Sequence, residues 1–246
     1  MPILTSLHPF APLRSHLLKY YDLIKRSINT IGRYGILESS KETGSAAAAS
    51  ASLGEAREQR RRIILAAARL FCRLGYNRTT VRALAAEVGM QSGNLFYHFK
   101  NKDDVLEAVM REGVLLATEA ADRALAAAGS TQERLRGLFR AHIQTLLGPD
   151  HEALQVMLYE WRRLPQEQHQ RLVALRDAYE ERWQVVLDAA AKEGLCPPDT
   201  RLFRRYLLGA LNWSSEWFRA SGEIEPSDLA DRFLRFALEG RTWTSP

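Results

Sequence analysis

Apolar residues recur every three or four positions along most of the chain, which is the spacing of helices that bury one face. Glycine and proline interrupt this pattern and mark the ends of the predicted helices. No stretch alternates apolar and polar residues in the way that a half-buried strand does. The sequence therefore predicts an all-α fold, with helices over residues 57–74, 102–128, 131–147, 150–163, 165–193, 199–219 and 226–240.

Residues 79–99 predict two short helices joined by a tight turn. Thr79 or Thr80 can cap the first helix, because a threonine hydroxyl accepts a hydrogen bond from a free backbone N–H. Gly89 can adopt the left-handed conformation that ends a helix. The residues expected to face inward are Val81, Leu84, Ala85, Val88, Leu95, Phe96 and Phe99. The pattern is that of a helix-turn-helix, whose second helix can enter the major groove of DNA.

The positive charge of the chain lies in the segment that holds this motif and ahead of it, where residues 1–50 carry six Lys/Arg and three Asp/Glu, a net charge of +3. The chain has 246 residues and 46% hydrophobic content, enough to bury a sizeable core in two domains or fewer. Residues 51–112 carry eleven Lys/Arg and seven Asp/Glu, a net charge of +4, whereas residues 113–246 carry seventeen and nineteen, a net charge of −2. A basic segment beside a slightly acidic one suits a protein that binds phosphates through one of its parts.

Residues 1–53 differ in pattern from the rest and are expected to form an N-terminal extension. Apolar residues at helical spacing among basic ones, from Leu17 to Arg33, allow a short amphipathic helix that could contact a membrane surface or a partner. A frayed tail, or a start codon assigned too far upstream, is the simpler interpretation and the one we favour. The Ser-, Ala- and Gly-rich residues 38–56 predict a flexible linker.

A set of residues between Arg62 and Leu106 occurs in an order that few protein families share. The set comprises Ile64–Phe71, Gly75, Tyr76, Thr79–Val81, Ala85, Gly89, Leu95–Phe99, Lys102 and Leu106. In these residues the chain resembles the DNA-binding domain of the TetR family of transcriptional regulators. The resemblance implies a three-helix DNA-binding domain over residues 54–101 and a larger helical domain for effector binding and dimerisation over residues 102–246. The helix over 102–128 would link the two.

The candidate contacts to double-stranded DNA lie in and around the helix-turn-helix. The resemblance and the chemistry of the side chains assign phosphate contacts to Thr79, Thr80, Tyr97, His98 and Lys102. Gln and Asn recognise adenine through paired hydrogen bonds, so base reading is expected from Gln91, Ser92 and Asn94, with Gly93 allowing close approach of the backbone. Arg82 projects from the first helix and can reach a base or a phosphate.

The sequence does not indicate an enzyme, a metal site or a cofactor. The six histidines lack the i, i+4 spacing of a helical metal pair, and no glycine-rich phosphate loop or GxSxG motif occurs. Cys72 and Cys196 lie far apart, so a disulfide scaffold is not expected and a reducing cytoplasm is the natural compartment. No run of about 18 apolar residues exists, so we expect no membrane span.

Aromatic residues are concentrated in the second half of the chain, which holds all five tryptophans. Such residues are more often core than pocket, but arginines beside Trp161 and an asparagine beside Trp213 favour a small-molecule site. The region around Tyr159–Leu164 and Leu208–Trp213 is similar to the TetR subgroup that controls fatty-acid and steroid catabolism, which implies an acyl-CoA effector. The candidate effector residues are Trp161, Arg162, Arg163, Trp183, Asn212, Trp213 and Trp217. The alternative for the arginines is a surface ion pair with Glu160 or Glu167.

The last two predicted helices have broad apolar stripes. The family resemblance implies that they pair with their copies in a homodimer, which would bind a roughly palindromic operator. The sequence thus predicts a repressor that a small molecule releases from DNA. Two other interpretations stay open: a helical ligand-binding or membrane-surface module without DNA binding, and an all-α enzyme that uses the C-terminal cavity.

Overall fold

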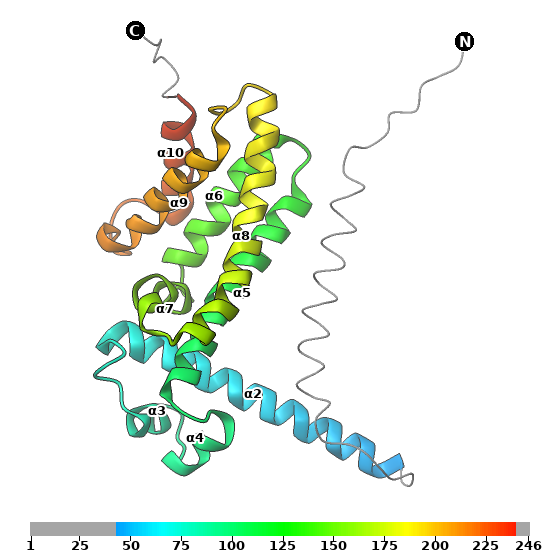
Figure 1. The fold of residues 1–246 in the computed structure, drawn as a ribbon, viewed down its shortest axis with the longest axis vertical. Coiled ribbons are helices and arrows are strands. Elements are labelled where there is room, and N and C mark those ends of the chain that lie inside the picture. The colour runs from blue at the N-terminus through cyan, green and yellow to red at the C-terminus, as the bar shows by residue number, and fades with distance from the viewer. Residues whose placement is uncertain (1–42, 240–246) are drawn as a thin grey trace. The chain divides into compact units, whose positions relative to one another are not determined.

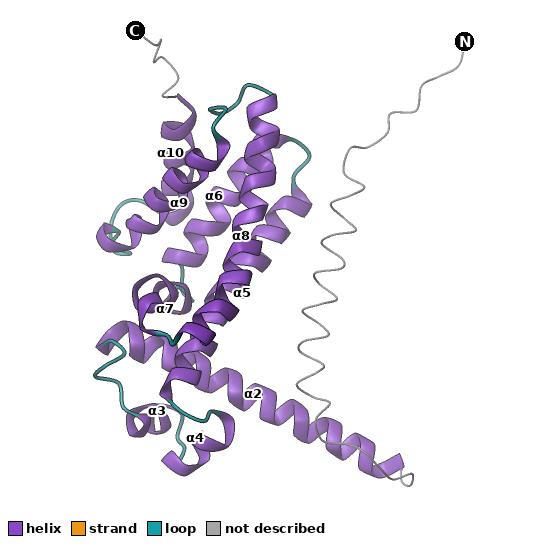
Figure 2. Ribbon diagram, in the orientation of Figure 1, coloured by secondary structure: helices purple, strands orange, loops and turns teal. Residues whose placement is uncertain are grey.

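The computed structural model describes residues 43–239, with side chains described from residue 54 to residue 238. The chain divides into two units between residues 52 and 53, and the described helices from residue 53 onward belong to the second unit. Every regular element between residues 43 and 239 is a helix, so the predicted all-α fold is confirmed (Figure 2). The helices are α2 (Thr43–Leu74), α3 (Val81–Glu87), α4 (Ser92–His98), α5 (Lys102–Ala127), α6 (Thr131–Leu147), α7 (Glu152–Glu160), the 3₁₀ turn η1 (Trp161–Arg163), α8 (Gln166–Lys192), α9 (Thr200–Trp217) and α10 (Pro226–Glu239).

Local capping chemistry explains why several of these helices begin where the sequence predicts. The Asn101 side chain accepts a hydrogen bond from the amide of Asp104 at 2.8 Å and caps α5. Ser130 and Glu133 form a reciprocal capping box at the start of α6. The Thr80 hydroxyl accepts from the amide of Ala83 and caps α3.

Two predicted boundaries are wrong. The linker expected over residues 38–56 is not irregular where the structure describes it, because α2 already begins at Thr43. Its first turns are rich in alanine, the residue with the highest helix propensity, and they continue into the helix predicted over 57–74. The helix predicted over 150–163 is divided into α7 and η1, which precede Pro165.

The C-terminal part of α2 together with α3 and α4 forms a small domain, called the head below, whose apolar residues share one buried cluster. Ile63, Leu70 and Phe71 of α2 are buried in the same cluster as Leu84 of α3 and Leu95 of α4. Gly89, at φ +68°, turns the chain between α3 and α4 as predicted. Phe96 was expected to face inward, but its side chain is 52% exposed. In a helix of seven residues, Leu95 already occupies the inward face, and the next residue points about 100° away from it.

Helix α5 joins the head to the remaining helices and packs against α6, α7 and α8 (Figure 1). It approaches α7 closely at Gly113, where a Cβ atom would lie 2.5 Å from the carbonyl oxygen of Ala153. Polar contacts hold α8 along α5: Gln168 donates to Asp104, and Arg171 makes a bidentate ion pair with Glu107. Helix α5 is therefore fixed to its neighbours over much of its length.

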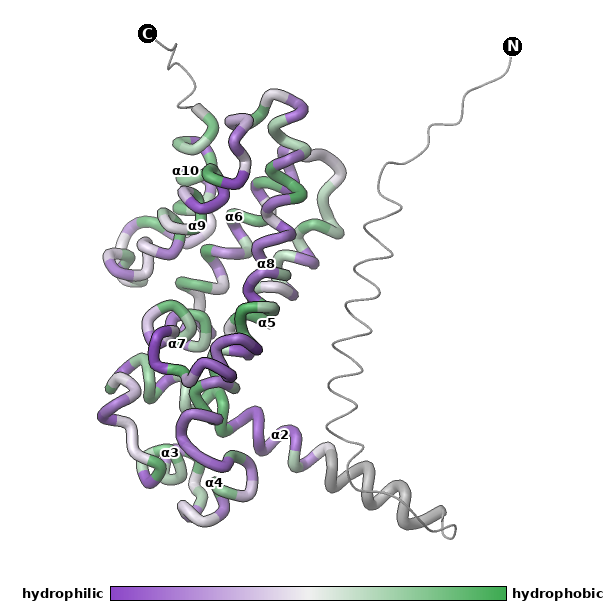
Figure 3. The backbone as a smooth tube through the Cα atoms, in the orientation of Figure 1, coloured by the Kyte–Doolittle hydropathy of each residue, from purple (hydrophilic) through white to green (hydrophobic). Residues whose placement is uncertain are grey.

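The C-terminal helices complete the larger domain. Helix α6 packs against α10, where Arg140 makes a bidentate ion pair with Asp231, and α9 packs against α8 and α6. Each of these helices carries both hydrophobic and hydrophilic stretches in Figure 3, as expected for helices with one buried face. Within residues 43–239, no helix is long and apolar enough to cross a membrane. The amphipathic helix considered for the region from Leu17 to Arg33 lies outside the described residues.

Candidate DNA-binding and effector sites

The outer face of α4 presents the residues expected to read bases. Gln91, Gly93 and Asn94 are exposed at the N-terminal end of this helix, and Ser92 is half-buried. The Asn94 amide N–H donates to the carbonyl of Gln91 at 3.0 Å, which orders the first turn of the helix. The buried Leu95 anchors the opposite face, so the polar side chains are held outward on a fixed support.

The residues expected to contact phosphates fall into two groups. Thr80, Arg82 and Tyr97 are exposed, and Tyr97 is the most exposed large hydrophobic residue of the head at 86%. Thr79 is fully buried, and its hydroxyl lies 2.9 Å from the carbonyl oxygen of Gly75 and donates inward. The structure therefore gives Thr79 an internal role in place of the expected phosphate contact, because its hydroxyl closes the turn that follows α2.

Lys102 is also directed into the protein. Its Nζ donates to the carbonyl oxygens of Tyr76 and Thr79, each at 3.0 Å, and lies 4.0 Å from the centre of the Tyr76 ring. These contacts use two of the three N–H donors of the ammonium group, and an aromatic face lies beside it. The side chain is only half-buried, so the phosphate contact expected of Lys102 stays a prediction.

His98 is half-buried at the end of α4, where its ring meets that of Tyr97 edge to face. Burial and the nearby charge of Arg60 lower the pKa of His98. The lowered pKa favours the neutral imidazole, which can still donate one hydrogen bond to a phosphate. Arg60 lies over the ring of Phe99, 4.5 Å from its centre, which places a guanidinium beside α4.

Six of the seven candidate effector residues occupy three separate places, and Arg163 lies apart from them at the head. The first is a pocket of about 250 Å³ at the end of α7. Trp161 packs edge to face on His169, and the guanidinium of Arg176 lies 5.3 Å from the centre of the Trp161 ring. The lining combines apolar surface with two guanidinium groups, and its residues are Met157, Leu158, Tyr159, Trp161, Arg162 and Arg176.

The second place is a polar cluster inside the core. His142 Nδ1 lies 2.6 Å from the Tyr179 hydroxyl, and its Nε2 lies 3.0 Å from Asn212 Oδ1. An amide oxygen only accepts, so Nε2 carries the proton and Nδ1 accepts from the tyrosine. Burial lowers the pKa of His142 to about 4, against the opposing effect of its hydrogen bond to Asn212. The fully buried Trp183 stands edge to face with the imidazole, so Trp183 belongs to the core, and the half-buried Asn212 lies at its edge.

The third place is the surface of α9. Trp213 and Trp217 are 66% and 46% exposed, respectively, and lie on one face with the exposed Leu202 and Tyr206. The structure therefore does not bring the candidate tryptophans together in one effector site. Sequence spacing placed each of them on a helix, but it did not show which helix face each one occupies relative to the neighbouring helices.

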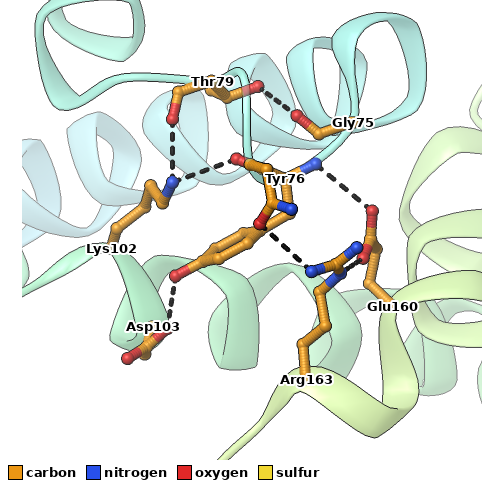
Figure 4. Close-up of polar contacts among 8 residues, drawn as sticks. Gly75, Tyr76, Thr79, Lys102, Asp103, Glu160 and Arg163 are labelled. Atoms are coloured by element: carbon orange, nitrogen blue, oxygen red, sulfur yellow. Dashed lines mark hydrogen bonds and ion pairs between the residues drawn. The ribbon is translucent and has the colours of Figure 1, made fainter.

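Arg163 faces the head and not the pocket. It forms an ion pair with Glu160, as the surface alternative predicted, and donates to Asn77 Oδ1 at 3.1 Å. Glu160 accepts in turn from the backbone amide of Tyr76 at 3.2 Å (Figure 4). The Tyr76 hydroxyl donates to Asp103 at the start of α5. Burial, together with the hydrogen bond to this carboxylate, raises the pKa of the Tyr76 hydroxyl above its usual range. Sequence reasoning missed this junction, whose partners lie more than 80 residues apart.

Comparisons with known proteins agree with this geometry. The family model for bacterial regulatory proteins of the tetR family matches residues 63–109, and the model for tetracyclin repressor-like C-terminal domains matches residues 128–241. The repressor KstR2 of Mycolicibacterium smegmatis is 28% identical over 189 residues, which are 75% of this chain and 91% of that protein.

Two solved structures share the fold. The superantigen PfiT is 41% identical, with a TM-score of 0.65 over 74% of this chain and 97% of PfiT. The complex of AibR with isovaleryl coenzyme A and operator DNA is 26% identical, with a TM-score of 0.68 over 73% of this chain and 98% of AibR. The family models match both the head and the larger domain, and these relatives are consistent with them. The chain belongs to the TetR family of transcriptional regulators, which are DNA-binding proteins rather than enzymes.

Proposed function

We propose that this chain is a homodimeric repressor that binds a palindromic operator through α4 and leaves it when an acyl-CoA thioester binds the larger domain. The observation that carries the DNA-binding half of the proposal is the outer face of α4, where Gln91 and Asn94 project from a helix anchored by the buried Leu95. Amide side chains in this position suit bidentate hydrogen bonding to adenine in the major groove.

The pocket at the end of α7 supports the effector half of the proposal. Trp161 and three neighbouring apolar or aromatic side chains can receive an acyl chain, and the guanidinium groups of Arg162 and Arg176 can meet a phosphate or carboxylate of the same molecule. A larger groove between α5 and α6 is lined by five alanines and by three arginines, Arg123, Arg136 and Arg140, each of which already forms an ion pair with a carboxylate of this chain. AibR, which shares the fold, was solved with a coenzyme A thioester and operator DNA.

The exposed aromatic and aliphatic side chains of α9 support the homodimer. Leu202, Tyr206, Trp213 and Trp217 repeat along one face of the helix, and Phe236 of α10 is also exposed. Apolar surface of this extent is typical of an interface, and a two-fold pair would place two copies of α4 on one side of the dimer. Two α4 helices separated by about one turn of DNA, or a multiple of it, would read the two halves of a palindrome.

We infer the same domain division as from the sequence, with a head over residues 54–101 and a larger domain over residues 102–246. The two family models support it, since one falls mostly in each part. Action on bacterial DNA would place the protein in the cytoplasm. The proposed control is a two-state equilibrium in which the thioester favours the dimer whose heads no longer match the operator.

A footprinting experiment at controlled salt tests the DNA-binding half of the proposal. The protein should protect a roughly palindromic site in the region upstream of its own gene, and its affinity should fall as salt rises because phosphate contacts release counterions. Protection of a site without two-fold symmetry would contradict the dimeric arrangement. Binding that is equal on unrelated DNA of the same length would contradict a sequence-specific repressor.

A further inference from the structure

The segment from Tyr159 to Arg163 contacts the effector pocket and the head at the same time. Tyr159, Trp161 and Arg162 line the pocket. Glu160 and Arg163, which alternate with them in sequence, bond to the turn that connects α2 to α3. The end of α7 and the whole of η1 are therefore shared by both regions, over five consecutive residues.

The bonds to the head act on its backbone. Gly75, at φ +77°, ends α2, and the amide that follows such a glycine usually bonds back to a carbonyl of the same helix. The Tyr76 amide donates to Glu160 Oε1 at 3.2 Å, so a side chain of α7 supplies this acceptor. Lys102 binds the carbonyls of Tyr76 and Thr79 from the other side of the turn (Figure 4). The turn leads directly into α3, which packs against α4.

The other end of the segment is also fixed. The Tyr159 hydroxyl is hydrogen-bonded to Ser215 Oγ of α9, so the segment contacts one of the helices proposed to form the dimer. A short 3₁₀ turn has poorer hydrogen-bond geometry than an α-helix, and η1 can rearrange at lower cost than the helices beside it. A displacement of the Trp161 or Arg162 side chain would thus also move Glu160 and Arg163, which occupy the neighbouring positions of the segment.

We infer that Glu160 and Arg163 are positioning residues that couple occupation of the pocket to the α2–α3 turn, and through it to the orientation of α4. Filling the pocket displaces η1, weakens the Glu160–Tyr76 and Arg163–Asn77 bonds and releases the turn. This inference depends on the proposed function for the identity of the molecule that fills the pocket. The coupling itself is a property of the contacts described above.

Hydrogen exchange at the amides of residues 75–80 tests the coupling without DNA or effector. The variants are Leu158→Trp, which fills the pocket from its own wall, Glu160→Ala, and the combination of the two. Glu160→Ala should accelerate exchange at the Tyr76 amide about tenfold, since a hydrogen bond to a charged group is lost. Leu158→Trp should accelerate exchange in the wild-type background and have little further effect in the Glu160→Ala background.

Two further variants separate coupling from general destabilisation. Asp122→Asn disrupts a bidentate ion pair with Arg182, between α5 and α8 of the larger domain, and should leave hydrogen exchange at residues 75–80 unchanged. Glu160→Gln keeps an acceptor for the Tyr76 amide and should restore most of the protection lost in Glu160→Ala. Where Leu158→Trp fails to fold, Trp161→Ala disturbs the same segment by removing volume from the pocket wall and replaces it in the cycle.

Equal effects of Leu158→Trp in the two backgrounds would overturn the inference, as would unchanged exchange at Tyr76 in Glu160→Ala. A separate titration with isovaleryl-, octanoyl- and palmitoyl-CoA addresses the proposed function. If none of these releases wild-type protein from its operator while the exchange cycle shows coupling, the thioester proposal fails and the coupling stands. If a thioester releases wild type and Glu160→Ala equally well, the coupling fails and the proposed function stands.

Discussion

Asn94 and Lys102 show how differently two polar residues of one motif are used. Asn94 is exposed on the outer face of α4, whereas the ammonium group of Lys102 is bound by two carbonyls and an aromatic ring inside the head. Lys102 belongs to the family pattern and Asn94 precedes the matching stretch Leu95–Phe99, but neither their chemistry nor their spacing distinguishes the two roles. The contacts that distinguish them come from Tyr76 and Thr79, in a turn more than 20 residues earlier.

Replacing Asn94 with alanine is expected to weaken operator binding by about 1–3 kcal/mol, because a base loses its paired hydrogen bonds. The slope of log affinity against log salt should stay unchanged, since no phosphate contact is lost. Fluorescence anisotropy over a range of salt concentrations measures both quantities. Gln170→Ala, at an exposed position of α8, serves as the control. An altered salt slope at unchanged base preference would show that Asn94 contacts the backbone instead.

His142 gives the stability of the protein a defined dependence on pH. Its pKa is about 4 in the folded protein and near 6.5 when exposed, so the unfolded chain takes up a proton at higher pH than the folded one. The contribution to the free energy of unfolding is complete above pH 6.5 and is lost between pH 6.5 and 4, by at most about 3 kcal/mol. Urea unfolding of wild type and His142→Gln across this range measures it. Parallel pH profiles for the two proteins would contradict the assignment.

At the scale of elements, the close contact of α5 with α7 depends on one glycine. A methyl group at Gly113 would lie 2.5 Å from Ala153 O and 2.6 Å from Leu154 N, which are backbone atoms and cannot rotate away. Gly113→Ala is therefore expected to destabilise the protein by about 3 kcal/mol. Gly54→Ala, where no atom lies within 4 Å of the new methyl, should be neutral or stabilising. Thermal unfolding of both variants tests the contrast, and equal melting temperatures would contradict it.

The exposed face of α9 is the proposed dimer interface, and a charge placed on it should prevent dimerisation. Trp213→Glu places a charge at the centre of the proposed dimer interface, where it would be buried without a partner. Sedimentation should find a monomer for this variant and a dimer for wild type and for Gln170→Glu, a control on α8. A Trp213→Glu protein that remains dimeric at the same concentration would show that the copies associate through a different surface.

The helices could be predicted well because their ends depend on local signals. Asn101, the Ser130–Glu133 capping box and Gly194 at φ +68° each act on the backbone within a few residues, and the predicted ends near them agree with the structure to within about two residues. The exposure of Phe96 and the inward course of Lys102 could not be predicted, because each depends on which neighbouring side chain already fills the space. The separation of the tryptophans into core, pocket and surface has the same cause.

The whole molecule combines a DNA-reading head with a pocket that shares a segment with it. Helix α5 connects the head to the larger domain, where it packs against α6, α7 and α8. The end of α7 and the turn η1 connect the pocket wall to the α2–α3 turn. Two connections at different points of the head would constrain its orientation, so a change at η1 alone would tilt the head about α5. Such a tilt would change the distance between the two α4 helices of a dimer and hence its fit to a palindrome.

The most direct test of effector-controlled repression is operator affinity at fixed salt with and without acyl-CoA thioesters. Isovaleryl-, octanoyl- and palmitoyl-CoA are titrated against the wild-type complex with its upstream DNA, with free coenzyme A as the control. We predict that at least one thioester lowers operator affinity tenfold or more, a coupling of about 1.4 kcal/mol or greater, and that Arg162→Ala weakens its effect. Unchanged affinity with every thioester would contradict the proposed effector class, and no sequence-specific binding at low salt would contradict the repressor itself.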